Sequence, residues 1–247
     1  MKLPGSYFTG SGSCGITVTQ SHVTIRGRGA GAGGTLIDCA QRSRHFIILG
    51  DNVTLVGLSL VNGSARARAC GPATPCTFAA DGGCVVLAGR SAFLSGCALT
   101  NCFADGRGGA LFVAQGPVRL STVHIFGCQA TYGGALWVGA PTALSAETSL
   151  SSCAAYRGGG VFVQGSGGSL TATRTAVFEC QAKDAGGAIY ANLNASIRLQ
   201  DVLVQANGAG ANGGGVCIVE GGTLQVGGDS TVEDNTVRAL SGRILSL

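Results

Sequence analysis

Short bursts of apolar residues, each introduced by a pair of glycines, recur along most of the chain. Six of them read DGGCVVL, RGGALFV, YGGALWV, RGGGVFV, AGGAIYA and NGGGVCI, at 81–87, 107–113, 132–138, 157–163, 185–191 and 212–218. Their first glycines are 25 to 28 residues apart. Self-similarity at such a period predicts a stacked-repeat architecture.

The four positions after each glycine pair predict a strand with one face in a core. The second and fourth positions are aliphatic or alanine in all six segments. Because residues two apart lie on the same face of a strand, we expect both columns to point inward. The second-position column is Val85, Leu111, Leu136, Val161, Ile189 and Val216, and the fourth is Leu87, Val113, Val138, Val163, Ala191 and Ile218.

A cysteine or asparagine stands five or six residues before each of the last five glycine pairs. We call these positions the marker column: Cys102, Cys128, Cys153, Cys180 and Asn207. We expect it to point inward at a corner, where asparagine can bond turn amides and cysteine packs as a small apolar side chain. Stacked coils would bring neighbouring cysteines within disulfide reach, but the regular column and the odd total of eleven cysteines favour the reduced state.

The intervals between these markers hold two further alternating runs per repeat, such as Val118 and Leu120, then Val123 and Ile125. The pattern therefore predicts an all-β fold, a single-stranded right-handed parallel β-helix with three short strands per coil and roughly nine coils. The glycine pair is expected to turn a corner through positive φ. We expect one domain, 1–247, with a loop inserted at 64–80, in which Cys70 and Cys76 could form a disulfide.

Composition narrows the class of protein. Glycine accounts for 43 of the 247 residues, well above its usual share of about 7%. Charged residues make up 11% of the chain, compared with about 25% in ordinary domains. The net charge of +4 comes from scattered lysines and arginines, so no nucleic acid partner is expected. No apolar run reaches the about 18 residues of a membrane-spanning helix. Residues 1–15 lack the apolar core of a signal peptide, which predicts either no secretion by that route or a fragment.

The glycine pair followed by aliphatics, phased with an aliphatic residue three positions before Asn or Cys, resembles the repeats of polymorphic outer membrane proteins. The opening run VTIRG, GGTLIDC, RHFIILGDNVTLVGLSLVNG resembles the first coils of pectate-lyase-like β-helix proteins. Aliphatic residues replace the aromatic that is usual in the outer membrane repeats, and cysteine replaces asparagine in four coils. The resemblance implies a right-handed β-helix at the cell surface or outside the cell.

The same resemblance directs attention to aspartates, which serve related enzymes as calcium ligands or as paired acid and base groups. Eight Asp and four Glu are present, but no two Asp are adjacent or one residue apart. Asp81, Asp105 and Asp184 fall one to three residues before glycine pairs, where they could form a site or serve as ordinary turn residues. We favour turns, and assign no catalytic residue, metal ligand or cofactor.

An aromatic column occupies the third position after four consecutive glycine pairs: Phe112, Trp137, Phe162 and Tyr190. Because the second and fourth positions face inward, this aromatic strip should face outward. It could stabilise the sheet surface by stacking, or form a platform for a polysaccharide or a surface protein. If the facing is inverted, the rings belong to the core.

We therefore expect a non-catalytic, extended β-helix with a surface-recognition, adhesion or structural role, with the aromatic strip as its binding residues. The alternative is a polysaccharide lyase or glycoside hydrolase of the pectate-lyase-like class. Three converging acidic side chains beside a basic residue would favour the enzyme. The pattern specifies neither a ligand nor an oligomeric state.

Overall fold

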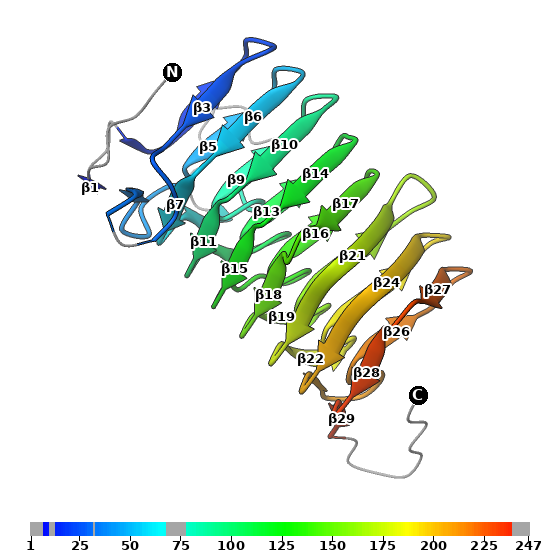
Figure 1. Cartoon of the computed structure of the whole chain (residues 1–247). Helices are drawn as coiled ribbons and strands as arrows, with labels where there is room; N and C mark the ends of the chain where they lie inside the picture. Colours follow the sequence, from blue (N-terminus) through cyan, green and yellow to red (C-terminus); the bar gives the residue numbers. More distant parts are fainter. Residues whose placement is uncertain (1–6, 10–12, 32, 68–77, 239–247) are drawn as a thin grey trace.

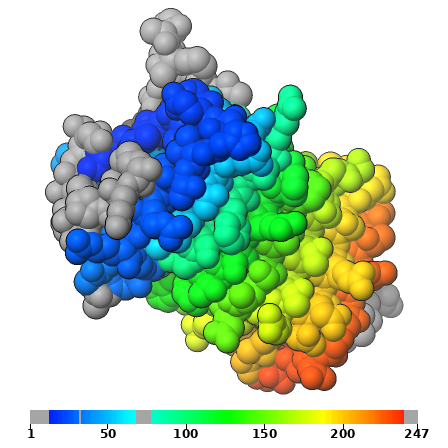
Figure 2. All heavy atoms as spheres, turned by 45° about the horizontal axis from the view of Figure 1, so that its top comes forward, coloured from blue at the N-terminus to red at the C-terminus, as the bar shows by residue number. Residues whose placement is uncertain are grey.

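The computed structural model describes residues 7–9, 13–31, 33–67 and 78–238. These residues form short strands and no α-helix. The strands pair in parallel and wind into a β-solenoid of about eight turns, one for each strand of its eight-stranded sheet (Figure 1). In Figure 2 successive turns appear as bands that pass from blue to red. The all-β parallel solenoid predicted from the repeat is confirmed.

Each turn contributes to four walls, which we number in chain order. Wall one begins directly after each glycine pair, walls two and three follow, and wall four lies between the marker column and the next glycine pair. Wall one contains β2 (Ile16–Val18), β5 (Phe46–Ile48), β9 (Val85–Leu87), β13 (Leu111–Val113), β16 (Leu136–Val138), β20 (Val161–Gln164), β23 (Ile189–Asn192) and β26 (Val216–Ile218).

Walls two and three belong to one sheet because two long strands, β21 (Ser169–Phe178) and β24 (Ser196–Gln205), run through both. The other strands of wall two are β3 (Thr24–Arg26), β6 (Val53–Val56), β10 (Ala92–Ser95), β14 (Val118–Ser121), β17 (Thr142–Ser145) and β27 (Thr223–Gly227). Those of wall three are β1 (Tyr7–Thr9), β4 (Thr35–Asp38), β7 (Leu58–Val61), β11 (Ala98–Thr100), β15 (His124–Phe126), β18 (Ser149–Ser151) and β28 (Thr231–Glu233).

Wall four is an addition to the three strands per coil that the pattern predicted. Its strands have only two to five residues: β8 (Ser64–Ala65), β12 (Phe103–Ala104), β19 (Ala154–Arg157), β22 (Gln181–Ala185), β25 (Gly208–Ala209) and β29 (Thr236–Val237). Isolated bridges through Gln129 join β12 to β19. Strands this short carry no alternating apolar signal, so the pattern did not separate them from the corner.

The predicted core columns stack in register inside the solenoid. Leu111 pairs with Val85 on one side and Leu136 on the other, and the column continues through Val161 and Ile189. All five side chains are 0–1% exposed. The inward facing of the second and fourth positions is therefore confirmed, and each turn lies about 4.8 Å from the next.

Both glycines of the pair are required by the backbone, for different reasons. The first has φ between 54° and 68° in all six segments, a region that side chains rarely adopt. The second packs against the backbone of wall four in the neighbouring turn. A Cβ on Gly109, for example, would lie 2.7 Å from the backbone N and O of Gln129. The predicted corner is confirmed, and both glycines lie too close to backbone atoms for a Cβ to fit.

The loop predicted at 64–80 lies partly in the described structure. Ser64–Ala65 form β8 and pair with β12, so the insertion leaves the solenoid after this strand. Phe78 returns to it with its ring centroid 5.8 Å from that of Phe112. Cys70 and Cys76, and any bond between them, lie outside the described residues.

Candidate functional site

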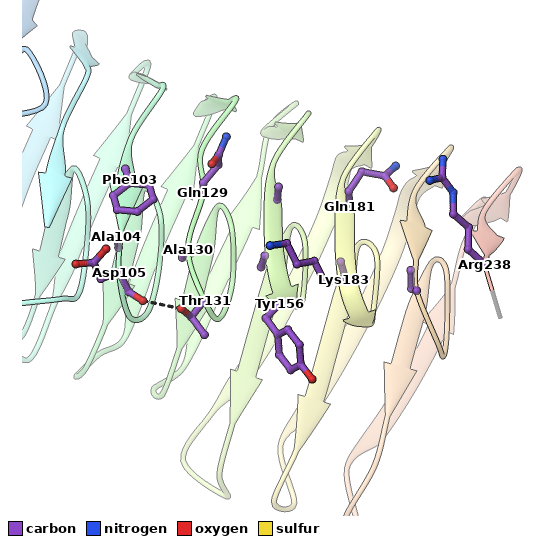
Figure 3. Close-up of a pocket in the computed structure, with 15 residues that line it drawn as sticks. Phe103, Ala104, Asp105, Gln129, Ala130, Thr131, Tyr156, Gln181, Lys183 and Arg238 are labelled. Atoms are coloured by element: carbon purple, nitrogen blue, oxygen red, sulfur yellow. Dashed lines mark hydrogen bonds between the residues drawn. The ribbon is translucent and has the colours of Figure 1, made fainter. Parts of the chain in front are cut away.

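A groove of about 800 Å³ runs along wall four, crossing several turns of the solenoid (Figure 3). Its lining comes from equivalent positions of successive turns, so it extends parallel to the solenoid axis. Three kinds of residue line it: alanines, uncharged polar or aromatic side chains, and a few charged groups. They include Phe103, Ala104, Asp105, Gln129, Ala130, Thr131, Ala155, Tyr156, Gln181, Ala182, Lys183, Ala209 and Arg238.

A row of alanines forms the floor of the groove. Each stands two residues after a member of the marker column: Ala104, Ala130, Ala155, Ala182 and Ala209. Ala155 pairs with Ala182, and Ala182 with Ala209. Ala104 is 1% exposed and Ala182 6%. Small side chains here keep the surface low along wall four, and that creates the groove.

The residue that follows each of the first four alanines supplies a polar or charged group to the groove. Asp105, Thr131, Tyr156 and Lys183 occupy this position in four consecutive turns. Thr131 donates its hydroxyl proton to the Asp105 carbonyl oxygen at 2.6 Å. The Asp105 carboxylate accepts a hydrogen bond from the Ala67 amide at 2.9 Å. The Tyr156 side chain is exposed.

Charge is distributed unevenly along this groove. Among the described residues that line it, Asp105 is the one carboxylate, and it lies toward the amino-terminal turns. Lys183 and Arg238 are exposed and line its carboxy-terminal part. Figure 3 shows the Asp105 carboxylate and these two cationic side chains on different turns. A chain lying along the groove would meet hydroxyl and amide groups throughout, and positive charge toward one end.

The aromatic strip lies on the outer side of wall one, as parity predicted. It forms a cluster separate from the main core. Phe112 stacks on Trp137 with centroids 4.6 Å apart, and Phe162 on Tyr190 with centroids 5.0 Å apart. The rings are nevertheless only 2% to 8% exposed.

Side chains from the residue preceding each glycine pair cover the strip. The Arg107 guanidinium lies 4.4 Å from the Phe112 centroid and 4.9 Å from that of Trp137. Tyr132 contacts Phe162 edge to face at 5.2 Å. The Arg157 guanidinium lies 5.4 Å from the Tyr190 centroid. The strip is a second, layered cluster and offers little ring surface to a ligand.

Two of the three aspartates singled out in the sequence hold these arginines in place. Asp81 accepts hydrogen bonds from Arg107 at 3.0 and 2.7 Å, and Asp184 accepts one from Arg157 at 2.6 Å. The third, Asp105, lies in the groove. In the part of the chain that the structure describes, no three Asp, Glu, His or Cys side chains gather as a metal site would require.

The marker column points inward as predicted, with every member 0–1% exposed. Its redox state was predicted wrongly at one position, because Cys102 forms a disulfide with Cys84 in the same turn. Cys128, Cys153 and Cys180 are free. Burial raises the pKa of the Cys128 thiol. A second disulfide joins Cys14 and Cys39.

Sequence reasoning missed the groove, although a signal for it was present. Alanine recurs two residues after each marker position in five turns, and a fixed small residue in a repeat indicates a close contact or a hollow. The adjoining, variable column from Asp105 to Lys183 is where side chains can differ without disturbing the stack.

Protein-family models gave no match to this chain, and neither curated proteins nor solved structures gave one. Among the described residues, no helix is long and apolar enough to cross a membrane. The groove is therefore the feature from which a function can be inferred.

Proposed function

We propose that this chain is a non-catalytic recognition module that binds an extended carbohydrate chain in the groove along wall four. The observation that carries the proposal is the groove itself. It is about 800 Å³ in volume, open along the solenoid axis, and lined by equivalent residues of successive turns. A linear polymer with a regular repeat suits such a surface, since each unit meets a similar set of groups.

The lining suits sugars better than an apolar peptide. Gln129, Thr131 and Gln181 offer hydroxyl and amide groups that can bond sugar hydroxyls. Tyr156 is 46% exposed and provides an aromatic face. Lys183 and Arg238 favour a chain that carries carboxylate or sulfate groups at that end. This recognition role moves the binding surface from the aromatic strip to wall four.

Location and family belong to the same proposal. The Cys14–Cys39 and Cys84–Cys102 disulfides are typical of an oxidising compartment, which supports placement outside the cell or in its envelope. The repeat pattern supports a relationship with pectate-lyase-like and polymorphic outer membrane β-helices.

The arrangement of carboxylates favours recognition over cleavage. Hydrolysis of a glycosidic bond generally uses two carboxyl groups on either side of the bond. The described part of the groove lining has one, Asp105, while Asp81 and Asp184 are held by arginines on the neighbouring corner. A lyase or hydrolase would need its second group from elsewhere.

A glycan array, run alongside a polysaccharide-cleavage assay, tests the proposal. We expect binding to acidic polysaccharides without release of shorter products. Tyr156→Ala and Lys183→Gln should each weaken binding at least several-fold. The matched controls Phe126→Ala and Arg198→Gln, which remove an exposed ring from wall three and an exposed cation from wall two, should not.

Equal losses in the groove variants and the controls would refute the groove as the binding surface. Cleavage that is abolished by Asp105→Asn would establish the enzyme instead. Absence of binding to every acidic and neutral polysaccharide on the array would remove the carbohydrate assignment.

A further inference from the structure

We propose that Asn52 and Asn194 are acceptor sites for N-linked glycans. Each begins an Asn-x-Ser/Thr triplet without proline, at 52–54 and 194–196, and this is the acceptor pattern for that modification. A third triplet, at 62–64, has the same pattern, but its asparagine and serine side chains are engaged in the fold. This proposal does not depend on what the groove binds.

Both asparagines lie on the corner that joins wall one to wall two. Asn52 falls between β5 and β6, and Asn194 between β23 and β24. Their side chains are exposed, and their φ angles are 54° and 62°. This corner forms one long edge of the solenoid, away from wall four (Figure 1). Glycans on it would project into solvent and leave the groove open.

The hydroxyl residues of these two triplets are not required by the core. In β6, Val53 points inward and Thr54 outward. Thr54 pairs with Thr24 in the preceding turn and with Phe93 in the next, so this position also accepts a residue without a hydroxyl. Ser196 is exposed at the first position of β24, and its partners in the neighbouring turns, Ser169 and Thr223, also carry hydroxyl groups. Both hydroxyl residues therefore lie outside the core, two residues after an exposed asparagine.

The third triplet, by contrast, is explained by the fold. Asn62 lies at the corner between walls three and four, where its Nδ2 donates to the Asp38 carboxylate at 3.0 Å. Ser64 is 5% exposed. Asn101 occupies the equivalent corner of the next turn with the same φ of 54°, and no Ser or Thr stands two residues after it. Asn62 therefore differs from Asn52 and Asn194 because its side chain is held by Asp38 and the hydroxyl residue of its triplet is buried.

The chemistry requires an oligosaccharide carried on a polyprenyl diphosphate. Nδ2 of the asparagine forms a bond to C1 of the first sugar, and the C1–O bond to the diphosphate breaks. The diphosphate leaves with the bonding electrons, and the Nδ2 proton passes to a base of the transferase. This transfer takes place in the secretory compartment, whose oxidising conditions fit the Cys14–Cys39 and Cys84–Cys102 disulfides.

The test is expression of the full chain behind a cleavable signal sequence in a eukaryotic secretory host. The secreted protein is treated with an amidase that removes N-glycans in heavy-oxygen water, and its peptides are analysed by mass spectrometry. We expect the label at Asn52 and Asn194, and none at Asn62 or Asn101. Thr54→Val and Ser196→Ala should each remove one glycan while keeping its asparagine.

Translation with microsomal membranes provides a second readout that does not depend on folding or export. The wild type should gain glycan mass that Thr54→Val and Ser196→Ala each reduce by one unit. An unmodified Asn52 or Asn194 in both systems would overturn the assignment of that site. A glycan on Asn62 of the secreted, folded protein would overturn the distinction between the two kinds of corner.

Discussion

Protonation of the buried His45 should destabilise the fold below neutral pH. His45 is 0% exposed and donates from Nε2 to the Ile37 carbonyl at 2.9 Å. Its Nδ1 has no hydrogen-bond partner in the described structure. Gly63 provides the space, since a Cβ there would lie 2.9 Å from that nitrogen. A second proton on the ring would therefore place a positive charge in the core, where burial disfavours it.

Burial lowers the pKa of His45 from 6.5 to about 4, while hydrogen bonding to the Ile37 carbonyl and the charge of Asp38 act in the opposite direction. Between these pH values the unfolded chain binds a proton at His45 and the folded chain does not. Stability therefore falls as pH is lowered from 6.5 and levels off below about 4. A difference of this size corresponds to about 3 kcal/mol of unfolding free energy.

Urea unfolding followed from about pH 7 to about pH 4 measures this effect. Other groups titrate in the same range, so the informative quantity is the difference between the wild type and His45→Gln, which keeps a side-chain N–H donor. The wild type should lose about 3 kcal/mol more than the variant over this range. His124→Gln, at an exposed position of wall three, is the matched control and should follow the wild type. Parallel curves for the wild type and His45→Gln would refute the buried, neutral histidine.

Three further predictions concern the core, the aromatic strip and the free thiols. Leu136→Asp should lower the unfolding free energy by about 3 kcal/mol or more, whereas Thr171→Asp, on the outer face of wall two, should change it by about 0.5 kcal/mol at most; equal effects would contradict the assigned facing. Trp137 should emit at short wavelength and resist quenching by iodide, and Arg107→Ala should make it quenchable while the surface variant Arg119→Ala should not. Among the described free cysteines, half-buried Cys217 should react first with a thiol reagent. The buried ones should react only on unfolding, namely Cys97, Cys128, Cys153 and Cys180. Rapid labelling of all five in the native state would contradict the burial of these four.

The glycine pair and the columns behind it could be predicted from sequence because a stacked repeat tests each position many times. One aliphatic residue does not establish which face of a strand is buried. Aliphatic residues at the same position of successive turns, from Val85 to Ile189, do establish it. Parity then assigns the opposite face to Phe112 and Trp137. It does not reveal what covers that face, which depends on how the Arg107 side chain folds back over the rings.

Wall four was hidden for a related reason. Its strands are too short for alternation to appear, and its alanines read as turn residues. The groove is a property of three adjacent columns, small in the middle and variable beside it. Such a combination becomes visible only when the register between turns is known, as for Gln181 against Ala154.

The marker column shows how one buried position can accept two different residues. Asn207 accepts a hydrogen bond from the Cys180 amide through Oδ1 at 2.9 Å and donates through Nδ2 to the Val177 carbonyl at 3.0 Å. Cys128 contacts the equivalent backbone groups through its less polar thiol: its Sγ accepts from the Cys102 amide at 3.3 Å and donates to the Leu99 carbonyl at 3.8 Å. A thiol can both accept and donate, although more weakly than an amide.

The residue opposite the marker column in each turn explains why only one cysteine of the column is oxidised. Cys102 faces Cys84, the first residue after the glycine pair of its own turn, with Cα atoms 5.5 Å apart. In the next two turns that first residue is Ala110 and Ala135, so Cys128 and Cys153 have no partner across the turn. Oxidation thus follows the residue opposite the column within each turn, and the spacing between turns does not decide it. Cys128, left as a free thiol, makes with the backbone the two hydrogen bonds that Asn207 makes farther along the solenoid.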